Sequence, residues 1–203
     1  MTKDYMNNKK IFIDCGTHFG EGLDFFIKKL EINQDWEIHS FEANPTTFET
    51  FSDKSRYNHL QIKFYNLAVS DSDANVIFNR ETPKNYPEEF MMGGGSSFMP
   101  IDEWNPWGTF KEGYNNSVEV RSLNLSNFIN SLNSDNIYCK MDIEGAEFQT
   151  LEKMIEDGSI KKIKNIWIEF HENFFSNPAP YKKRKLKILE ELSNNNVSYF
   201  EWH

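Results

Sequence analysis

The chain has 203 residues and a formal net charge of −9, and its length fits one α/β domain. Hydrophobic residues make up 38% of it and Phe alone accounts for 18 positions, which is the composition of a folded protein. The negative charge argues against nucleic acid as a partner, because phosphates are bound by Lys and Arg. No apolar run approaches the roughly 18 residues of a membrane helix, so no membrane partner is expected.

Both cysteines, Cys15 and Cys139, fall inside or at the end of runs that predict buried strands. Free thiols and a reducing, cytoplasmic location are therefore the simpler interpretation. Residues 1–10 are polar and lack the apolar segment of a signal peptide. We expect them to form a short N-terminal tail, followed by a single domain over residues 11–203.

The first third of the chain alternates between two kinds of apolar pattern. Short apolar runs predict buried strands, and apolar residues spaced three and four apart predict helices. The strands are expected at Ile11–Asp14, Trp36–Phe41 and Gln61–Tyr65, and the helices at Gly20–Leu30 and, opened by Pro45, at Thr46–Ser52. Such alternation indicates a parallel sheet with right-handed crossovers.

The pattern changes in the middle of the chain. Asn75–Asn79 and Ser117–Ser122 alternate polar and apolar residues, which is typical of an inserted antiparallel hairpin. Between them lies a long irregular stretch, residues 80–116, rich in Pro, Gly and Trp. A stretch of this length inside a compact domain is usually functional or disordered, and its aromatic content favours a lid or a substrate wall.

The strand–helix alternation then resumes. Helices are predicted at Leu125–Leu132, Phe148–Asp157 and Tyr181–Asn194, and strands at Ile137–Ile143, Ile163–Phe170 and Val197–Trp202. The predicted fold class is α/β: a Rossmann-like, mostly parallel sheet with helices on both faces, plus the inserted hairpin and the long aromatic loop.

The first candidate ligand site is the loop Asp14–Gly20, which follows the first strand. Asp14 stands where the dinucleotide-binding pattern G-x-G-x-x-G has its first glycine, and its carboxylate would repel a pyrophosphate. A ligand with an ammonium and a sulfonium group would not be repelled. The candidate residues are Asp14, Gly16, Thr17, His18 and Gly20, although the same pattern is also compatible with a plain strand-to-helix turn.

Two further turns follow predicted strands and could contact an adenosine. Glu42 ends the second strand, where an acidic side chain suits the two hydroxyls of a ribose, and Ala43 and Asn44 lie beside it. Asn66 and Ala68 follow the third strand and could face an adenine edge. NAD-binding proteins share the acidic residue, so Glu42 indicates an adenosine without naming the ligand.

The segment Lys140–Glu147 places several charges at the end of a predicted buried strand. Charged side chains there are costly unless they pair or bind something. Alternation along an extended segment would put Lys140, Asp142 and Glu144 on one side. We expect a functional role for Asp142 and Glu144, the alternative being that the charges only pair with one another.

A histidine among carboxylates ends the next strand, in the segment Glu169–Glu172. His171 is the first candidate for a general base and Asp142 the second, the alternative for His171 being an ordinary surface position. Asp142, Glu144 and Glu169 could ligate Mg²⁺, but no metal is expected. There is no His/Cys cluster for zinc.

Together these motifs resemble the FkbM family of class I methyltransferases, from about Ile11 to about Trp202. The most specific piece is Lys140–Glu147, which looks like the family signature K-x-D-x-E-G-x-E. Gly94–Ser97, Val118–Val120 followed by Leu125, and Ile168–His171 also look like family features, in family order.

The resemblance implies S-adenosylmethionine as donor and methylation of a hydroxyl group on a small molecule or sugar. By position, Asp14, Gly16 and Gly20 would hold the amino-acid end of the donor, Glu42 the ribose and the Asn66–Ala68 turn the adenine. Asp142 and Glu144 would flank the methyl group and the acceptor. Rival interpretations are an NAD- or nucleotide-sugar-binding enzyme and a non-catalytic S-adenosylmethionine-binding module.

The chain departs from the family pattern in two places. His18 stands where the family usually has Asn. Only one strand, Val197–Trp202, fits after the last helix, where the usual sheet ends in a two-stranded hairpin. An edge of the sheet would then be exposed, and a homodimer could cover it.

Overall fold

The computed structural model describes residues 9–51, 54–80, 95–100, 102–104 and 116–203. The predicted N-terminal tail up to residue 8 therefore lies outside the described residues. So does most of the predicted lid between residues 80 and 116, including Trp107 and Gly94. Within the described ranges, no helix is long and apolar enough to cross a membrane.

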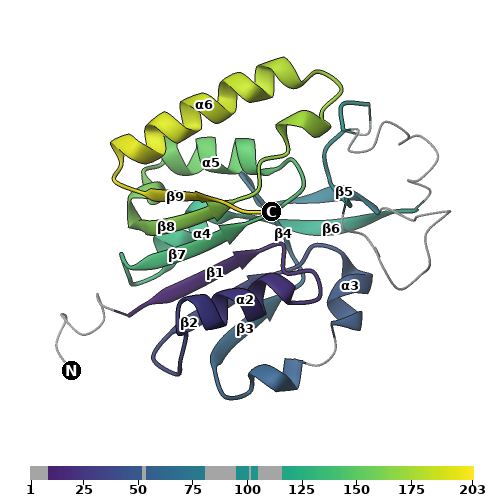
Figure 1. Cartoon of the computed structure of the whole chain (residues 1–203). Coiled ribbons are helices and arrows are strands. Elements are labelled where there is room, and N and C mark those ends of the chain that lie inside the picture. The colour runs from purple at the N-terminus through teal and green to yellow at the C-terminus, as the bar shows by residue number, and fades with distance from the viewer. Residues whose placement is uncertain (1–8, 52–53, 81–94, 101, 105–115) are drawn as a thin grey trace.

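The main sheet has six strands in the order β3-β2-β1-β7-β8-β9 (Figure 1). Every neighbouring pair is parallel, as the alternating pattern predicts. The strands are β1 (Ile11–Cys15), β2 (Glu37–Phe41), β3 (Gln61–Tyr65), β7 (Ile137–Met141), β8 (Ile163–Ile168) and β9 (Ser198–Glu201). A single strand, β9, follows the last helix and joins the sheet beside β8, as predicted.

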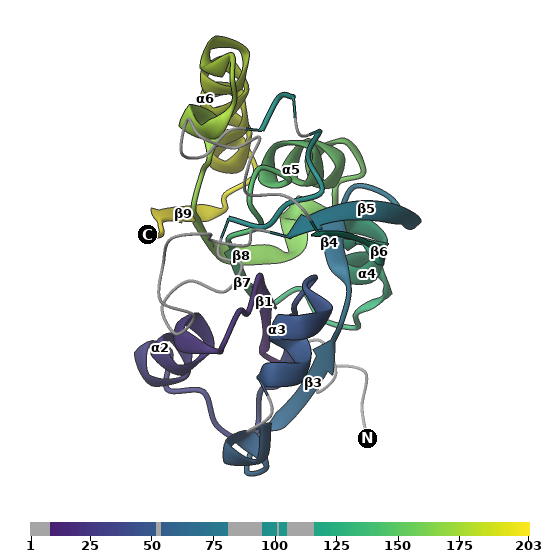
Figure 2. The same ribbon diagram turned by 90° about the vertical axis from the view of Figure 1, so that its right-hand side faces the viewer.

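Helices cover both faces of this sheet because successive strand residues point to opposite sides. On one face, Phe12 packs with Phe26 and Trp167 beneath α2 (Glu21–Lys29). On the other face, Ile11, Ile13 and Cys15 join the larger hydrophobic core. That face is covered by α4 (Leu125–Ser131), α5 (Glu147–Glu156) and α6 (Pro178–Asn194) (Figure 2). The short helix α3 (Pro45–Thr50) follows β2.

A small second sheet has the order β4-β6-β5. Its strands β5 (Ala74–Arg80) and β6 (Asn116–Asn124) pair antiparallel, which confirms the predicted hairpin. The third strand, β4 (Ala68–Ser70), was expected to belong to a loop but pairs parallel with β6. It is a strand because all three of its residues are buried, with Val69 in the main core and Ala68 in the small sheet's cluster.

Two predicted strands end earlier than expected. β7 stops at Met141 instead of Ile143, and β8 stops at Ile168 instead of Phe170. After β7 the chain turns, and Glu144 and Gly145 both have left-handed backbones, with φ of 52° and 97°. The expectation that Lys140, Asp142 and Glu144 alternate along one extended segment is therefore wrong beyond Met141. Strand alternation cannot continue through a turn with positive φ.

Candidate active site

A cavity of about 310 Å³ lies at the carboxyl ends of the parallel strands. That is within the range of small-molecule sites, and the cavity sits where the strand order reverses between β1 and β7, the usual ligand position in such sheets. Most of its polar lining comes from the ends of β1, β2, β7 and β8 and the turns that follow them. The lining residues are Gly16, Thr17, His18, Glu21, Gly22, Phe41, Glu42, Ala43, Leu67, Ala68, Val69, Phe98, Lys140, Asp142, Ile143, Glu144, Glu169, Trp202 and His203.

The turn after β1 requires glycine for a steric reason. Gly16 has φ of 81°, and a Cβ there would overlap the backbone carbonyl of Asp142. The N–H groups of Gly16 and Thr17 both donate to the carbonyl of Phe41, so the turn is fixed to the end of β2. Gly20, with φ of 91°, then begins α2. These bonds bring the turns after β1, β2 and β7 together around the cavity.

Asp14 lies beneath the cavity and does not line it. Its carboxylate is fully buried and accepts no hydrogen bond from the described part of the chain. Nζ of Lys140 lies 3.7 Å from its Oδ1. Burial raises the pKa of Asp14, and the Lys140 ammonium opposes that shift. Lys140 also donates to the carbonyls of Cys15 and Gly16. Lys140 lines the cavity whereas Asp14, beside it, does not.

Lys140 connects Asp14 to Asp142, whose Oδ2 is 3.4 Å from the ammonium. Burial lowers the pKa of Lys140, but Asp142 and Asp14 raise it more, so the lysine stays charged. The register places Lys140 directly beside Asp14 on neighbouring strands, which makes the contact a consequence of strand pairing.

Glu42 is held by the backbone at the wall of the cavity. Its Oε1 accepts from the N–H of Asn44 and its Oε2 from the N–H of His18, both at 2.8 Å. Burial raises the pKa of Glu42, and these two backbone donors oppose the rise. Each carboxylate oxygen keeps further capacity to accept a hydrogen bond, and Glu42 lines the cavity.

Two predicted ligand residues near Glu42 support the turn instead of lining it. Asn44 caps α3, because its side-chain oxygen accepts from the N–H of Thr46. The side-chain amide of Asn66 donates to the carbonyls of Glu42 and Ala43. Ala68 does line the cavity, together with its neighbours Leu67 and Val69.

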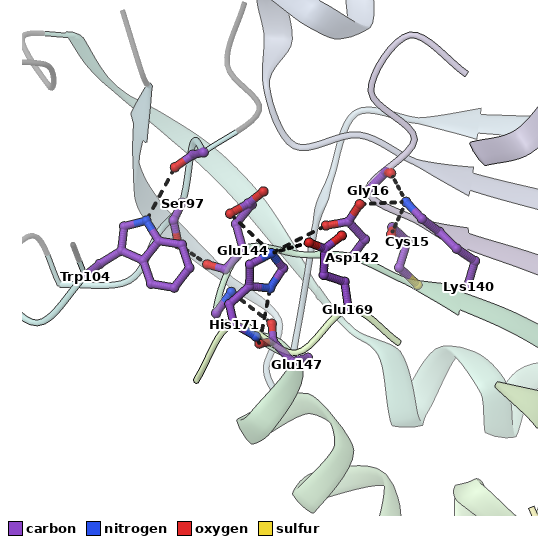
Figure 3. Close-up of polar contacts among 12 residues, drawn as sticks. Cys15, Gly16, Ser97, Trp104, Lys140, Asp142, Glu144, Glu147, Glu169 and His171 are labelled. Carbon is purple, nitrogen blue, oxygen red and sulfur yellow. Dashed lines mark hydrogen bonds and ion pairs between the residues drawn. The ribbon is translucent and has the colours of Figure 1, made fainter. Parts of the chain in front are cut away.

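His171 is surrounded by carboxylates (Figure 3). Its Nε2 lies 3.5 Å from Glu144 Oε2, and 3.8 Å from both Asp142 Oδ1 and Glu169 Oε1. Its Nδ1 lies 3.4 Å from Oε1 of the fully buried Glu147. Glu147 itself accepts from the N–H groups of His171 and Gly145, so it joins the turns after β7 and β8.

The surroundings of His171 argue against its predicted role as general base. Burial lowers its pKa, but Glu147, Glu144 and Asp142 outweigh burial and raise it to about 10. The imidazole is then already protonated near neutral pH in this arrangement and has no lone pair to accept a proton. The side chain is also only 2% exposed and does not line the cavity.

The carboxylates around His171 differ in their environment. Burial raises the pKa of Glu144 well above its ordinary value, and His171 opposes the rise. Burial and then Asp142 raise the pKa of Glu169, whose side chain is 30% exposed and lines the cavity. Glu169 therefore combines access with a raised pKa, which is what a general base at neutral pH needs.

The described part of the predicted aromatic loop fixes the Glu144 turn from outside. The hydroxyl of Ser97 donates to the carbonyl of Glu144 at 2.6 Å. The buried ring of Trp104, 1% exposed, packs against the same turn, so closely that a Cβ on Gly145 would overlap it. Only Phe98 of this segment lines the cavity. Ser97 belongs to the Gly94–Ser97 motif, so the sequence did signal it.

Sequence reasoning did not single out several cavity residues. Phe41, Phe98, Ile143, Trp202 and His203 all line it. Phe41 and Ile143 could have been found as neighbours of predicted motif residues. Trp202 and His203 gave no signal, because they reach the cavity only through the pairing of β9 with β8.

Comparison with known proteins agrees with this geometry. The family model described as the methyltransferase FkbM domain matches residues 14–196. No curated protein and no solved structure gives a significant match to the chain. The matched range contains the glycine turn, Glu42, the carboxylate cluster and the elements of the fold from the end of β1 to α6. The chain therefore belongs to the FkbM family of methyltransferases.

Proposed function

We propose that this methyltransferase moves a methyl group from S-adenosylmethionine to a hydroxyl group of a small molecule or sugar. The observation that carries the proposal is the charge of the cavity wall. Glu21, Glu42, Asp142, Glu144 and Glu169 all line it. A donor with a sulfonium and an ammonium group suits such a wall, whereas the pyrophosphate of NAD would be repelled by it.

The residues present fit the parts of that donor. Glu42 offers two carboxylate oxygens, fixed by backbone donors, to the two hydroxyls of a ribose. The apolar wall of Leu67, Ala68 and Val69 suits an adenine face. Gly16 and Thr17 line the cavity and could receive the amino-acid portion of the donor, whereas Asp14 and Gly20 of the same loop do not line it.

Catalysis by this chain would consist mainly of alignment and proton removal. When bound, S-adenosylmethionine supplies a methyl group that its positive sulfur has already activated. The acceptor hydroxyl would lie beside the Glu169 and Asp142 carboxylates, and Glu169 would take its proton. Asp142 would serve as a positioning residue, because it lies between Lys140 and His171.

Calorimetry with S-adenosylhomocysteine and with NAD tests the donor. We expect the first to bind and the second not to. Glu42→Gln should weaken S-adenosylhomocysteine binding about tenfold to a hundredfold, because an amide nitrogen cannot accept from the N–H of His18 or Asn44. Glu156→Gln, on the exposed side of α5, is the matched control and should bind normally.

Failure of the wild-type chain to bind S-adenosylhomocysteine would contradict the donor assignment. The acceptor assignment has a separate test, which is formation of S-adenosylhomocysteine from S-adenosylmethionine over a panel of sugars and small alcohols. Binding without turnover on any of them would favour the alternative of a non-catalytic module.

A further inference from the structure

The cluster around His171 contains a buried histidine whose ring makes no hydrogen bond to any of the described residues. The side chain is 2% exposed, and Nε2 faces Glu144, Asp142 and Glu169 at 3.5 to 3.8 Å. An N–H···O hydrogen bond would bring the two atoms to about 2.7–3.2 Å. Nε2 is thus near three carboxylates and bonded to none. Glu144 Oε2 is likewise buried without a hydrogen-bond partner.

The spacing suits donor atoms arranged around a common centre. Ligand atoms from Asp142, Glu144 and His171 lie within 4.8 Å of one another. Metal–nitrogen and metal–oxygen bonds of about 2.1 Å put neighbouring ligands on one ion about 3 to 3.5 Å apart. Small side-chain adjustments would therefore bring these three donors onto a single cation.

The other ring nitrogen of His171 also faces a carboxylate, as the second ring nitrogen of a metal-bound histidine usually does. Metal-ligating histidines usually direct their second ring nitrogen at a carboxylate, which fixes the ring and leaves the first nitrogen for the ion. Here Nδ1 lies 3.4 Å from Oε1 of Glu147. Glu147 is fully buried and is itself held by the N–H groups of His171 and Gly145. Within the described residues Nδ1 makes no hydrogen bond either, but Glu147 faces it from a fixed position while Nε2 faces the other three carboxylates.

We propose that Asp142, Glu144 and His171 form a binding site for one divalent metal ion, of the manganese type. Binding of the ion would displace the imidazole proton to solvent, which frees the Nε2 lone pair for the metal. One imidazole and two carboxylates make an oxygen-rich donor set with a single nitrogen, which suits Mn²⁺ better than the all-oxygen preference of Mg²⁺ or the nitrogen and sulfur preference of Zn²⁺. This revises the expectation from the sequence that no metal binds.

The site opens onto the cavity. Asp142 and Glu144 line it, while His171 lies behind them. A cation there would have coordination positions directed at the space proposed for the acceptor, and it could bind an acceptor oxygen. That consequence rests on the proposed function, whereas binding of the ion does not.

Titration of the chain with MnCl₂ alone, followed by the electron paramagnetic resonance signal of free Mn²⁺, tests the proposal. We expect one bound ion per chain and a rise in melting temperature on binding. Glu144→Gln and His171→Gln should each weaken Mn²⁺ binding at least about tenfold, since loss even of an outer-shell partner costs that much. Glu144→Gln keeps the shape of a partly exposed side chain, so it retains a folded protein if His171→Gln does not.

Two exposed positions supply matched controls, His59→Gln and Glu156→Gln, and both should bind Mn²⁺ like the wild type. The proposal is wrong if the folded wild type binds no Mn²⁺ up to about 1 mM, a concentration that fills even weak protein sites for divalent cations. It is equally wrong if Glu144→Gln binds the ion as the wild type does. Because no methyl donor is present, the outcome is independent of S-adenosylhomocysteine binding.

Discussion

Among single residues, Glu169 and Asp142 line the same cavity but have different neighbours. Asp142 lies between the cations Lys140 and His171, at 3.4 and 3.8 Å. Glu169 also lies 3.8 Å from His171 Nε2, and its pKa is raised, first through burial and then through Asp142. A carboxylate with a raised pKa accepts a proton more readily, so the two positions should respond differently to neutralisation.

Glu169→Gln should lower the methyl-transfer rate by about a hundredfold to ten-thousandfold, because the amide cannot take the hydroxyl proton. The affinity for S-adenosylhomocysteine should change little. Rates are measured on whichever acceptor the panel identifies, and affinity by calorimetry. A rate within a factor of two or so of wild type would remove Glu169 as the base.

Two glycines have similar backbone conformations but different surroundings. Substitutions at the two positions therefore distinguish the energetic cost of a left-handed backbone from the cost of a steric overlap. Gly16 and Gly158 have φ of 81° and 75°, but only a Cβ on Gly16 would meet another atom, the carbonyl of Asp142. Gly158→Ala should cost about 1 to 2 kcal/mol for the left-handed backbone alone. Gly16→Ala should cost more than about 4 kcal/mol. Urea unfolding of both variants measures the difference, and equal costs would contradict the overlap.

Among the helices, α5 has a buried face and a partly exposed face that should contribute unequally to stability. Leu151 is fully buried in the main core, whereas its neighbour Glu152 faces Arg184 of α6. Arg184 donates to both oxygens of Glu152, at 2.8 and 2.7 Å, in a partly exposed pair.

Leu151→Ala should therefore lower the free energy of unfolding by about 2 to 5 kcal/mol, since it leaves a cavity. Glu152→Gln should lower it by less than about 1 kcal/mol, since a solvated ion pair contributes little. Chemical denaturation of the two variants compares them directly. A larger loss for Glu152→Gln would mean that the ion pair, and not apolar packing, fixes α6 against α5.

For the whole molecule, acid sensitivity should depend on His39 in β2. The ring is 2% exposed, with Nδ1 3.0 Å from the hydroxyl of Tyr65 and Nε2 3.2 Å from Glu37. Burial lowers the pKa of His39 to about 4, although Glu37 opposes the shift and Lys63 adds to it. Because the folded-state pKa lies below the unfolded value of about 6.5, the stabilisation is present above pH 6.5 and is lost as the pH falls toward 4.

The wild type should lose up to roughly 3 kcal/mol more stability than His39→Gln between pH 7 and pH 4. Glu37, with its pKa lowered to about 2 by Lys9, Lys63 and His39 against the effect of burial, loses its contribution at still lower pH. Unfolding at a series of pH values measures both proteins. Identical pH profiles would show that His39 does not titrate between the folded and unfolded states.

Sequence patterns predicted the main sheet well because they report local physics. Apolar runs of strand length and apolar residues at helical spacing located every strand and helix of the main layer to within a few residues. One error occurred at Glu144, where a turn with positive φ interrupts the strand-like alternation of side chains. The other was β4, whose three residues are too few to show an apolar pattern.

The sequence by itself determined the order of strands and helices, the glycine turn at Gly16 and the acidic end of β2 at Glu42. Each depends on residues close together in the chain. Only the tertiary structure decided that Lys140 covers Asp14, and that His171 stands with Nε2 among carboxylates and Nδ1 against Glu147. Those contacts join residues 24 to 126 positions apart, and their charge states depend on burial and on distances that strand pairing and helix packing set.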